Sequence, residues 1–254
     1  TGRGIAPVYA DKMFRNGIRM IDLLEPNILK QKLEKGYAFA KGIIEKSLNK
    51  KMTSEPKSIF QDYINFGIKL KDYVSDTSVE LYKAHQNGKS ILFEGAQGIS
   101  LDVDHGIYPY TTSSNTAAGH ISTGTGVSFR DIGRIIGVVK AYLSRVGESP
   151  LPSEIDGEMA EKIRDVGGEY GTTTGRPRRI GWLDLVQVRQ AGRVNGLTEI
   201  ALTKLDVLNG IKEIPVCIDY EIDGSTVSEM PASLTMYRNA KPVYKTLEGW
   251  DSIP

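Results

Sequence analysis

The sequence predicts an α/β fold in which a largely parallel central sheet is flanked by helices. Three observations carry this prediction. Residues 25–88 show apolar side chains at helical spacing, and residues 89–254 alternate short apolar runs with helix-like stretches. The segment 102–126 is rich in Gly, Ser and Thr, and loops of that length are often functional. We expect residues 1–254 to form part of a single domain, with a mainly helical subregion over 25–88 and a sheet region over 89–254.

Three helices are predicted in the first third of the chain. The first begins near Pro26, because proline is favoured in the first helical turn. Its apolar side chains follow helical spacing at Leu29, Leu33, Tyr37, Ala40, Ile44 and Leu48. Two more helices are expected over 58–70 and 77–86. Before them, residues 1–7 are expected to form a glycine-rich loop, followed by a short helix over 11–15.

The rest of the chain predicts strands and helices in alternation. Short apolar runs indicate strands at 90–93, 135–139, 199–202 and 214–220. A helix is expected over 182–194, ending at Asn195-Gly196. Because helices separate the strands, parallel pairing is expected, with ligands at the carboxyl ends of the strands.

The composition excludes several classes of protein. Lys and Arg number 32 against 31 Asp and Glu, so the net charge of +1 argues against binding to nucleic acid or membranes by charge alone. A single cysteine, Cys217, rules out an internal disulfide and a multi-cysteine zinc site. With no signal peptide and no long uncharged apolar run, we expect a cytoplasmic protein. The chain begins at Thr1 and its first Met is Met13, so we interpret it as a piece of a longer protein.

The segment 171–179 is the sharpest local signal for chemistry. It reads Gly171-Thr172-Thr173-Thr174-Gly175-Arg176-Pro177-Arg178-Arg179. Glycine lets backbone N–H groups approach an anion closely, and arginine binds phosphate or carboxylate through two parallel hydrogen bonds. The segment therefore predicts a site for an anionic small molecule. A solvated basic loop is the alternative. Gly-Arg-Pro also resembles the core of AT-hook peptides, which bind the DNA minor groove, but the near-neutral net charge of the chain argues against that interpretation.

The segment Thr203-Lys204-Leu205-Asp206 follows a predicted strand. A lysine stem can lie over a purine face, and a carboxylate can accept two hydrogen bonds from the adjacent N–H donors of guanine. Adenine presents an acceptor at the matching ring nitrogen and would be repelled. The segment predicts a guanine-binding site, with an exposed Lys–Asp pair as the alternative.

Two further segments have weaker signals. Gln97 follows the predicted strand at 90–93, where its amide could donate to and accept from a ligand, although a tight turn is the simpler interpretation. Asp102, Asp104 and His105 could bind a metal, but acidic residues before a glycine-rich loop more often cap turns, so no metal site is predicted in this chain.

Together, these segments resemble the adenylosuccinate synthetase family. Collinear matches run through the whole chain, at residues 1–7, 9–12, 92–98, 104–109, 112–115, 138–147, 171–179, 181–184, 203–207 and 247–250. The resemblance implies a P-loop-NTPase-like, GTP-binding architecture with a helical insertion. It also implies GTP-dependent ligation of IMP and L-aspartate to adenylosuccinate, GDP and phosphate through a 6-phosphoryl-IMP intermediate. This reaction is the first committed step of AMP synthesis from IMP, and the expected assembly is a homodimer.

The resemblance also implies roles for single residues. It assigns IMP binding to Thr1, Gln97, Thr112 and Arg176, with Gln97 also assisting the chemistry, and it implies that Arg15 reaches the IMP site of the partner subunit. It assigns L-aspartate binding to Thr172, Thr173, Thr174, Gly175 and Arg176. GTP binding is assigned to Arg178, Lys204, Leu205 and Asp206.

Several parts of the family's machinery are expected outside this chain. The resemblance implies that the phosphate loop, the catalytic Asp and His, and the ligands of the Mg²⁺ cofactor precede Thr1. A last guanine-contacting loop is expected after Pro254. We therefore expect residues 1–254 alone to be inactive. The alternatives are a non-catalytic module that binds purine nucleotides or nucleic acid, and a relative that uses another purine monophosphate.

Overall fold

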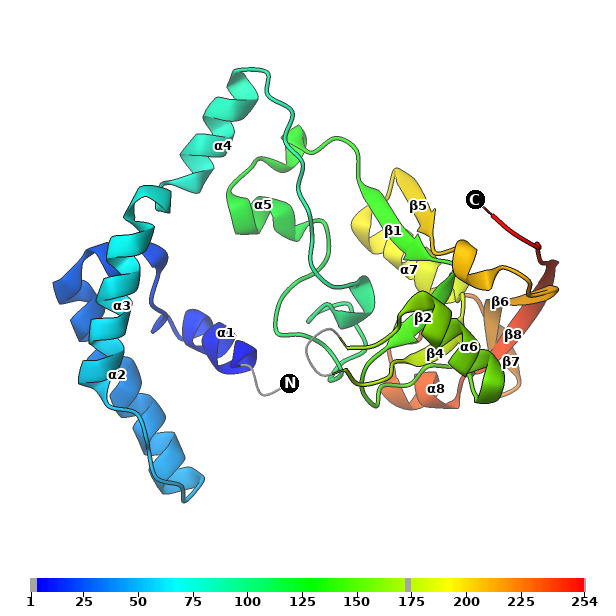
Figure 1. Ribbon diagram of the computed structural model, residues 1–254, viewed down its shortest axis with the longest axis horizontal. Coiled ribbons are helices and arrows are strands. Elements are labelled where there is room, and N and C mark those ends of the chain that lie inside the picture. The colour runs from blue at the N-terminus through cyan, green and yellow to red at the C-terminus, as the bar shows by residue number, and fades with distance from the viewer. Residues whose placement is uncertain (1–3, 172–174, 254) are drawn as a thin grey trace. The chain divides into compact units, whose positions relative to one another are not determined.

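The computed structural model describes residues 4–171 and 175–253. The chain divides into two compact units (Figure 1). One comprises residues 1–92 with 125–127 and is helical, and the other comprises residues 93–124 with 128–254 and contains the strands.

The helical unit is built around two long helices that pack side by side, α2 and α3 (Figure 1). Both begin at a proline, Pro26 and Pro56, as expected for a residue that tolerates the first helical turn. The unit comprises α1 (Ile5–Met13), η1 (Met20–Leu24), α2 (Pro26–Gly42), η2 (Ile43–Ser47), α3 (Pro56–Leu70), η3 (Lys71–Tyr73) and α4 (Thr77–Gln86).

Close packing and a buried charge fix this unit. Gly67 of α3 lies against the backbone of Leu23, where a Cβ would collide with the Leu23 carbonyl. Asp22 is buried and accepts hydrogen bonds from the Arg19 N–H at 2.7 Å and from Lys32 Nζ at 2.5 Å. The predicted helices over 26–48, 58–70 and 77–86 are confirmed to within a few residues. The prediction for 1–15 is wrong at its bounds, since the helix there is Ile5–Met13.

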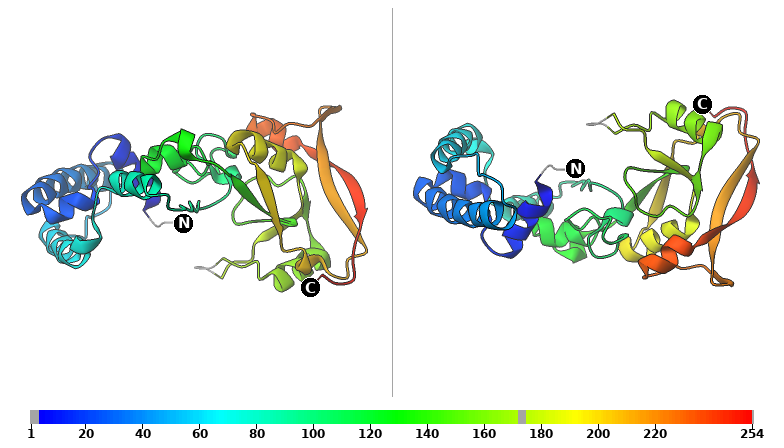
Figure 2. Two further views of the ribbon diagram at one scale, coloured as in Figure 1. Left: turned by 90° about the horizontal axis from the view of Figure 1, so that it is seen from above. Right: turned by 90° about the horizontal axis from the view of Figure 1, so that it is seen from below.

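In the second unit, one pair of strands is parallel. Strand β1 (Ile136–Lys140) pairs with β5 (Glu199–Thr203), and Lys140 lies opposite Thr203 at their carboxyl ends. The other strands pair antiparallel, in the orders β2-β4-β3 and β7-β6-β8. Figure 2 shows the two longest, β6 and β8, running side by side as orange and red ribbons. Their bounds are β2 (Tyr142–Arg145), β3 (Glu154–Ile155), β4 (Arg179–Trp182), β6 (Glu213–Ile222), β7 (Ser225–Val227) and β8 (Lys241–Glu248).

The predicted α/β class is therefore confirmed. Among the described strands, β1 and β5 form the parallel pair, and the remaining ladders are antiparallel. The strand predicted at 90–93 is wrong. These residues form no ladder in the described part of the chain, and Leu92 is 90% exposed. An apolar run becomes a strand only where a neighbouring backbone satisfies its N–H and C=O groups.

Helices and short turns complete the second unit. They are η4 (Ile99–Leu101), α5 (His120–Thr125), η5 (Phe129–Asp131), α6 (Gly157–Gly167), α7 (Leu185–Asn195), η6 (Asp206–Leu208) and α8 (Leu234–Asn239). The prediction of a helix over 182–194 is largely confirmed by α7, although Trp182 belongs to β4.

Two apolar clusters hold the sheet unit together. The first joins β2, β4, α6, η6 and β6, with Tyr142, Ile163 and Ile180 fully buried. The second joins α7, β6 and α8, with Val186, Tyr220 and Tyr237 at its centre. Because η6 belongs to the first cluster, the 203–208 segment is attached to the same core as β2 and α6.

Candidate functional site

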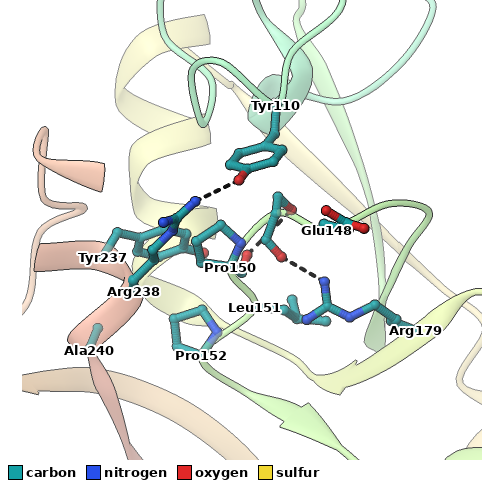
Figure 3. A pocket seen from close by; sticks show the side chains of 10 residues that line it. Tyr110, Glu148, Pro150, Leu151, Pro152, Arg179, Tyr237, Arg238 and Ala240 are labelled. Carbon is teal, nitrogen blue, oxygen red and sulfur yellow. Dashed lines mark hydrogen bonds between the residues drawn. The ribbon is translucent and has the colours of Figure 1, made fainter. Parts of the chain in front are cut away.

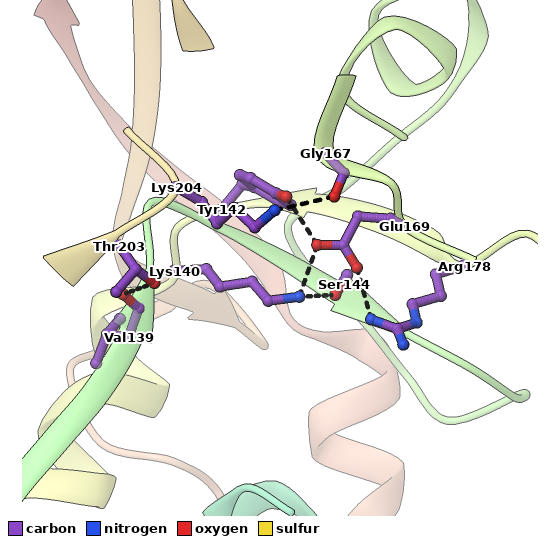
Figure 4. A network of polar contacts seen from close by, with 9 residues as sticks. All are labelled: Val139, Lys140, Tyr142, Ser144, Gly167, Glu169, Arg178, Thr203 and Lys204. Atoms are coloured by element: carbon purple, nitrogen blue, oxygen red, sulfur yellow. Dashed lines mark hydrogen bonds and ion pairs between the residues drawn. The ribbon is translucent and has the colours of Figure 1, made fainter. Parts of the chain in front are cut away.

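The carboxyl ends of β1 and β5 carry a network of polar side chains (Figure 4). Thr203 Oγ1 donates to the Val139 carbonyl at 3.2 Å and ties the two strands together. The next residue, Lys204, has a left-handed backbone with φ of 61°, and its Nζ donates to the Gly167 carbonyl at 3.1 Å. The chain therefore turns sharply at the end of β5 and directs the Lys204 side chain toward the end of α6.

A buried carboxylate, Glu169, is the centre of this network. Its Oε1 accepts from Lys140 Nζ at 2.6 Å and from the Tyr142 hydroxyl at 2.7 Å, and its Oε2 accepts from Arg178 Nη1 at 2.7 Å. Lys140 also donates to Ser144 Oγ at 2.8 Å. Figure 4 shows these groups converging from separate segments of the chain.

The Glu169 side chain is only 2% exposed, so its charge must be compensated. Burial raises the pKa of its carboxyl, but hydrogen bonds from Lys140, Tyr142 and Ser144 outweigh burial and bring the pKa to about 2. Burial, reinforced by Glu169, raises the pKa of the Tyr142 phenol, which remains a hydrogen-bond donor. Glu169 is therefore a permanent anion at neutral pH.

The end of α6 explains how Glu169 reaches this place. Gly168 adopts a left-handed backbone with φ of 64° and caps the helix through its N–H. The preceding residue, Gly167, lies so close to Tyr142 that a Cβ would collide with the phenol oxygen. Two consecutive glycines thus end the helix and let the Glu169 side chain reach Tyr142 of β2 and Lys140 of β1.

The arginine-rich segment closes into a loop directly after Glu169. The Arg178 N–H donates to the Glu169 carbonyl at 2.9 Å, and the Gly171 N–H donates to the Arg176 carbonyl at 2.8 Å. Gly175, with φ of 63°, donates to Gly171. Arg176 is exposed on this loop. The predicted aspartate contacts Thr172, Thr173 and Thr174 lie outside the described residues.

The two consecutive arginines of this segment face different surroundings. Arg178 pairs with Glu169, whereas Arg179, the first residue of β4, pairs with Glu154 at 2.6 Å and donates to the Ser149 carbonyl at 2.6 Å. Arg179 lines a polar pocket of about 510 Å³ on that side (Figure 3). There Arg238 donates to the Tyr110 hydroxyl at 2.6 Å. Arg179 thus supports the 147–154 loop and is separated from the network around Glu169.

The predicted guanine contacts differ in burial. Leu205 packs against the first apolar cluster, and Asp206 begins η6 with an exposed side chain. The structure therefore fixes the backbone of this segment and leaves the Asp206 carboxylate accessible.

The loop that carries Gln97 and Thr112 is organised by a second buried carboxylate, Asp102. Its Oδ1 accepts from the N–H groups of Asp104 and His105, both at 2.9 Å, and its Oδ2 accepts from those of Thr116 and Ala117 at 2.5 and 3.0 Å. Burial raises the pKa of Asp102, but these four hydrogen bonds outweigh it and lower the pKa. Asp102 thus caps turns, and the described residues contain no group of three or more His, Cys, Asp or Glu suited to a metal.

Gln97 and Thr112 lie on this same framework. Gln97 is exposed with φ of 63°, and the Thr112 N–H donates to the Leu101 carbonyl at 2.9 Å. The partly buried Arg145 donates to Ser100 Oγ at 3.0 Å and to the Tyr110 carbonyl at 2.8 Å, which ties the loop to β2. Arg15 is an exposed residue of the helical unit with φ of 61°, and Thr1 lies outside the described residues.

The family resemblance assigned both Arg178 and Lys204 to GTP binding, and the structure adds the groups that hold them. The sequence analysis gave no role to Glu169 or Lys140. A signal was present, since Gly167-Gly168 marks a helix end and Glu169 directly precedes the arginine-rich loop.

A comparison with known proteins identifies the family. The family model for adenylosuccinate synthetase matches residues 1–253. The chain belongs to the adenylosuccinate synthetase family. It is 50% identical over 250 residues to the adenylosuccinate synthetase of Thermodesulfovibrio yellowstonii, covering 98% of this chain and 59% of the relative. It is 51% identical over 253 residues to that of Geobacter sulfurreducens, covering 99% and 58%.

A solved member of the family has the same fold. The fully ligated adenylosuccinate synthetase from Plasmodium falciparum superposes with a TM-score of 0.91 at 34% identity, covering 98% of this chain and 59% of that one. This match agrees with the predicted P-loop-like, GTP-binding α/β architecture. The chain spans nearly three fifths of the length of these members. No helix in the described part of the chain is long and apolar enough to cross a membrane.

Proposed function

We propose that this chain is part of a GTP-dependent ligase that joins IMP and L-aspartate to form adenylosuccinate, GDP and phosphate. The observation that carries the proposal is the shared anchor of two predicted ligand contacts. Lys204 and Arg178 both bond to the turn that ends α6, through the Gly167 carbonyl and the Glu169 carboxylate. The 203–206 segment and the arginine-rich loop therefore border one site at the carboxyl ends of β1 and β5, where ligands of α/β sheets bind.

In this proposal, the nucleotide occupies that site. Asp206 accepts hydrogen bonds from two adjacent donors of guanine, and Lys204 and Leu205 flank the base. Arg178 contacts the GTP phosphates, because a guanidinium binds phosphate oxygens in pairs. Its ion pair with Glu169 supports this role by fixing where the guanidinium lies.

The substrates to be joined occupy the neighbouring loops. Thr172, Thr173, Thr174, Gly175 and Arg176 bind the carboxylates of L-aspartate, and Arg176 also contacts IMP. Gln97, Thr112 and Thr1 bind IMP, with Arg15 acting on the site of a partner subunit in a homodimer. These assignments rest on the family resemblance, and the shared framework of Gln97 and Thr112 around Asp102 supports their pairing.

The reaction has two steps in this proposal. IMP loses its N1 proton to a base, and the γ-phosphoryl group passes from GTP to the inosine 6-oxygen, which forms 6-phosphoryl-IMP and releases GDP. The neutral amine of aspartate then attacks carbon 6, a C–N bond forms, the new C–N nitrogen loses a proton, and phosphate leaves with the former 6-oxygen. Gln97 assists by hydrogen bonding at that oxygen. Mg²⁺, when bound, would neutralise phosphate charge, and the described residues contain no group of three or more His, Cys, Asp or Glu suited to hold it.

The test is product formation by the complete gene product with IMP, L-aspartate, GTP and Mg²⁺. We expect adenylosuccinate with IMP, and GMP substituted for IMP tests the alternative that another purine monophosphate is used. Product from GMP but none from IMP would establish that alternative. Nucleotide binding without product from either would favour a non-catalytic module. Residues 1–254, assayed beside it, are expected to be inactive.

A further inference from the structure

The turn that ends α6 connects two segments that the proposed function uses separately. Gly167 accepts from Lys204, and Glu169 accepts from Arg178 and Lys140. We propose that Glu169 is a positioning residue for the nucleotide, which holds Arg178 and Lys140 ready for the phosphate groups of GTP. This inference rests on the proposed function and adds two residues, Glu169 and Lys140, to the same site.

The exposure of the partners supports a role toward a ligand. Glu169 is 2% exposed, whereas the side chains of Lys140 and Arg178 are 34% and 27% exposed. One negative charge is thus surrounded by two positive charges, and the surplus charge is on the groups that reach solvent. Such a cluster fits an anion, because its cations are already oriented before the ligand arrives.

Stability alone does not require this arrangement. Burying a carboxylate carries a desolvation penalty that its partners must first offset, and apolar side chains of similar volume often stabilise a fold as well as a buried ion pair does. Pre-orientation has a direct benefit for binding, since an arginine side chain otherwise loses rotamer freedom when it meets its ligand. The network thus favours affinity for an anion over stability of the fold.

The neighbouring arginine provides a matched control. Arg179 pairs with Glu154 in an Arg–Glu ion pair like that of Arg178, but on the side facing the 510 Å³ pocket. Glu154→Gln removes the carboxylate partner of the adjacent arginine, Arg179, and this carboxylate is 28% exposed. It therefore separates loss of an ion pair from loss of nucleotide positioning.

The experiment compares Glu169→Gln with Glu154→Gln in the complete gene product. Two quantities are measured: the dissociation constant of a fluorescent GTP analogue and the KM values for GTP and IMP. For Glu169→Gln we expect the GTP dissociation constant and KM to rise about tenfold, with the KM for IMP changed less than about twofold. Glu154→Gln should change the GTP values by less than about twofold.

Lys140→Gln is a second variant that leaves the Glu169–Arg178 pair in place and does not bury a new group. Lys140→Gln should weaken GTP binding about threefold or more. This variant replaces Glu169→Gln in the test if Glu169→Gln does not fold. Unchanged GTP affinity in the folded variant, or equal losses in Glu169→Gln and Glu154→Gln, would overturn the inference. So would failure of the wild-type protein to bind the GTP analogue. Wild-type binding with the expected loss in Glu169→Gln, but without adenylosuccinate formation, would overturn the proposed function alone.

Discussion

The sheet unit contains two buried carboxylates whose surroundings differ in kind. Asp102 accepts four backbone N–H groups, whereas Glu169 accepts from a lysine, an arginine and a tyrosine. Four peptide dipoles spread the charge of Asp102 into the loop that they shape. The cations around Glu169 remain partly exposed, so their charge can act on a ligand. Asp102 thus fixes the conformation of a loop backbone, whereas Glu169 orients charged side chains at the surface.

The largest effect is expected from removing the charge of Asp102. In Asp102→Asn, the new NH₂ group faces backbone N–H donors, which then remain buried without acceptors. We expect the free energy of unfolding to fall by about 3 kcal/mol or more. Urea denaturation of the complete gene product measures it. Asp104→Asn changes an exposed carboxylate two residues away, bonded to Asn115, and should cost less than about 1 kcal/mol. Equal losses of unfolding free energy in the two variants would contradict the role of Asp102 in holding the loop.

A third carboxylate, Asp206, extends the comparison to an exposed group that is free to meet a ligand. Asp206→Asn replaces an oxygen acceptor with a donor, so guanine loses one partner and xanthine, which presents an acceptor there, gains one. We expect the preference for GTP over XTP to fall about 100-fold, corresponding to one strong pair of hydrogen bonds. Initial rates with each nucleotide measure the ratio. An unchanged ratio would remove Asp206 from the guanine site.

Arg176 and Arg178 sharpen the comparison within a single loop, because only Arg178 is paired with Glu169. Arg176→Ala should remove a charged hydrogen bond to a carboxylate and weaken apparent aspartate affinity by about 1.5–3 kcal/mol. The KM for GTP should change little. If the KM for GTP rises and the KM for aspartate does not, the assignment of ligands within the loop is wrong.

The smallest effect near neutral pH concerns titration. The pKa of Glu169 falls from 4.5 to about 2 on folding, and that of Asp102 is also lowered. A lowered carboxyl pKa stabilises the fold above the unfolded value, and this contribution is lost as the pH falls through the folded value. The free energy of unfolding should thus change little down to about pH 5 and then decrease toward pH 2. Glu169→Gln should flatten part of this decrease, and an identical acid slope would contradict the pKa shift.

The local features of this chain could be predicted from sequence, and the long-range features could not. Pro26 marks a helix start and Asn195-Gly196 closes α7, because helix ends depend on adjacent residues. The antiparallel pairing of β2, β3 and β4 depends on residues far apart in the chain. The apolar run at 90–93 shows the same limit, since its sequence is strand-like but no described backbone pairs with it.

The site divides in the same way. The arginine-rich loop and the 203–206 segment can be recognised in the sequence by their composition and spacing. Glu169 is an ordinary glutamate in the sequence, and its importance comes from Lys140 and Arg178, which lie 29 and 9 residues away. Thr203 and Val139 likewise meet only through the pairing of β1 with β5. Motifs therefore indicate what a ligand touches, whereas the structure is needed to identify what holds those groups in place.

The central claim is that the carboxyl ends of β1 and β5 form a guanine-nucleotide site of a ligase. The most direct test is the initial rate of adenylosuccinate formation by the complete gene product, with GTP or ATP as the phosphoryl donor and with IMP and L-aspartate held constant. On the proposed pairing of Asp206 with guanine, which adenine cannot make, GTP should support the reaction at least about 100-fold better than ATP. Equal rates with the two nucleotides, or a preference for ATP, would contradict the account.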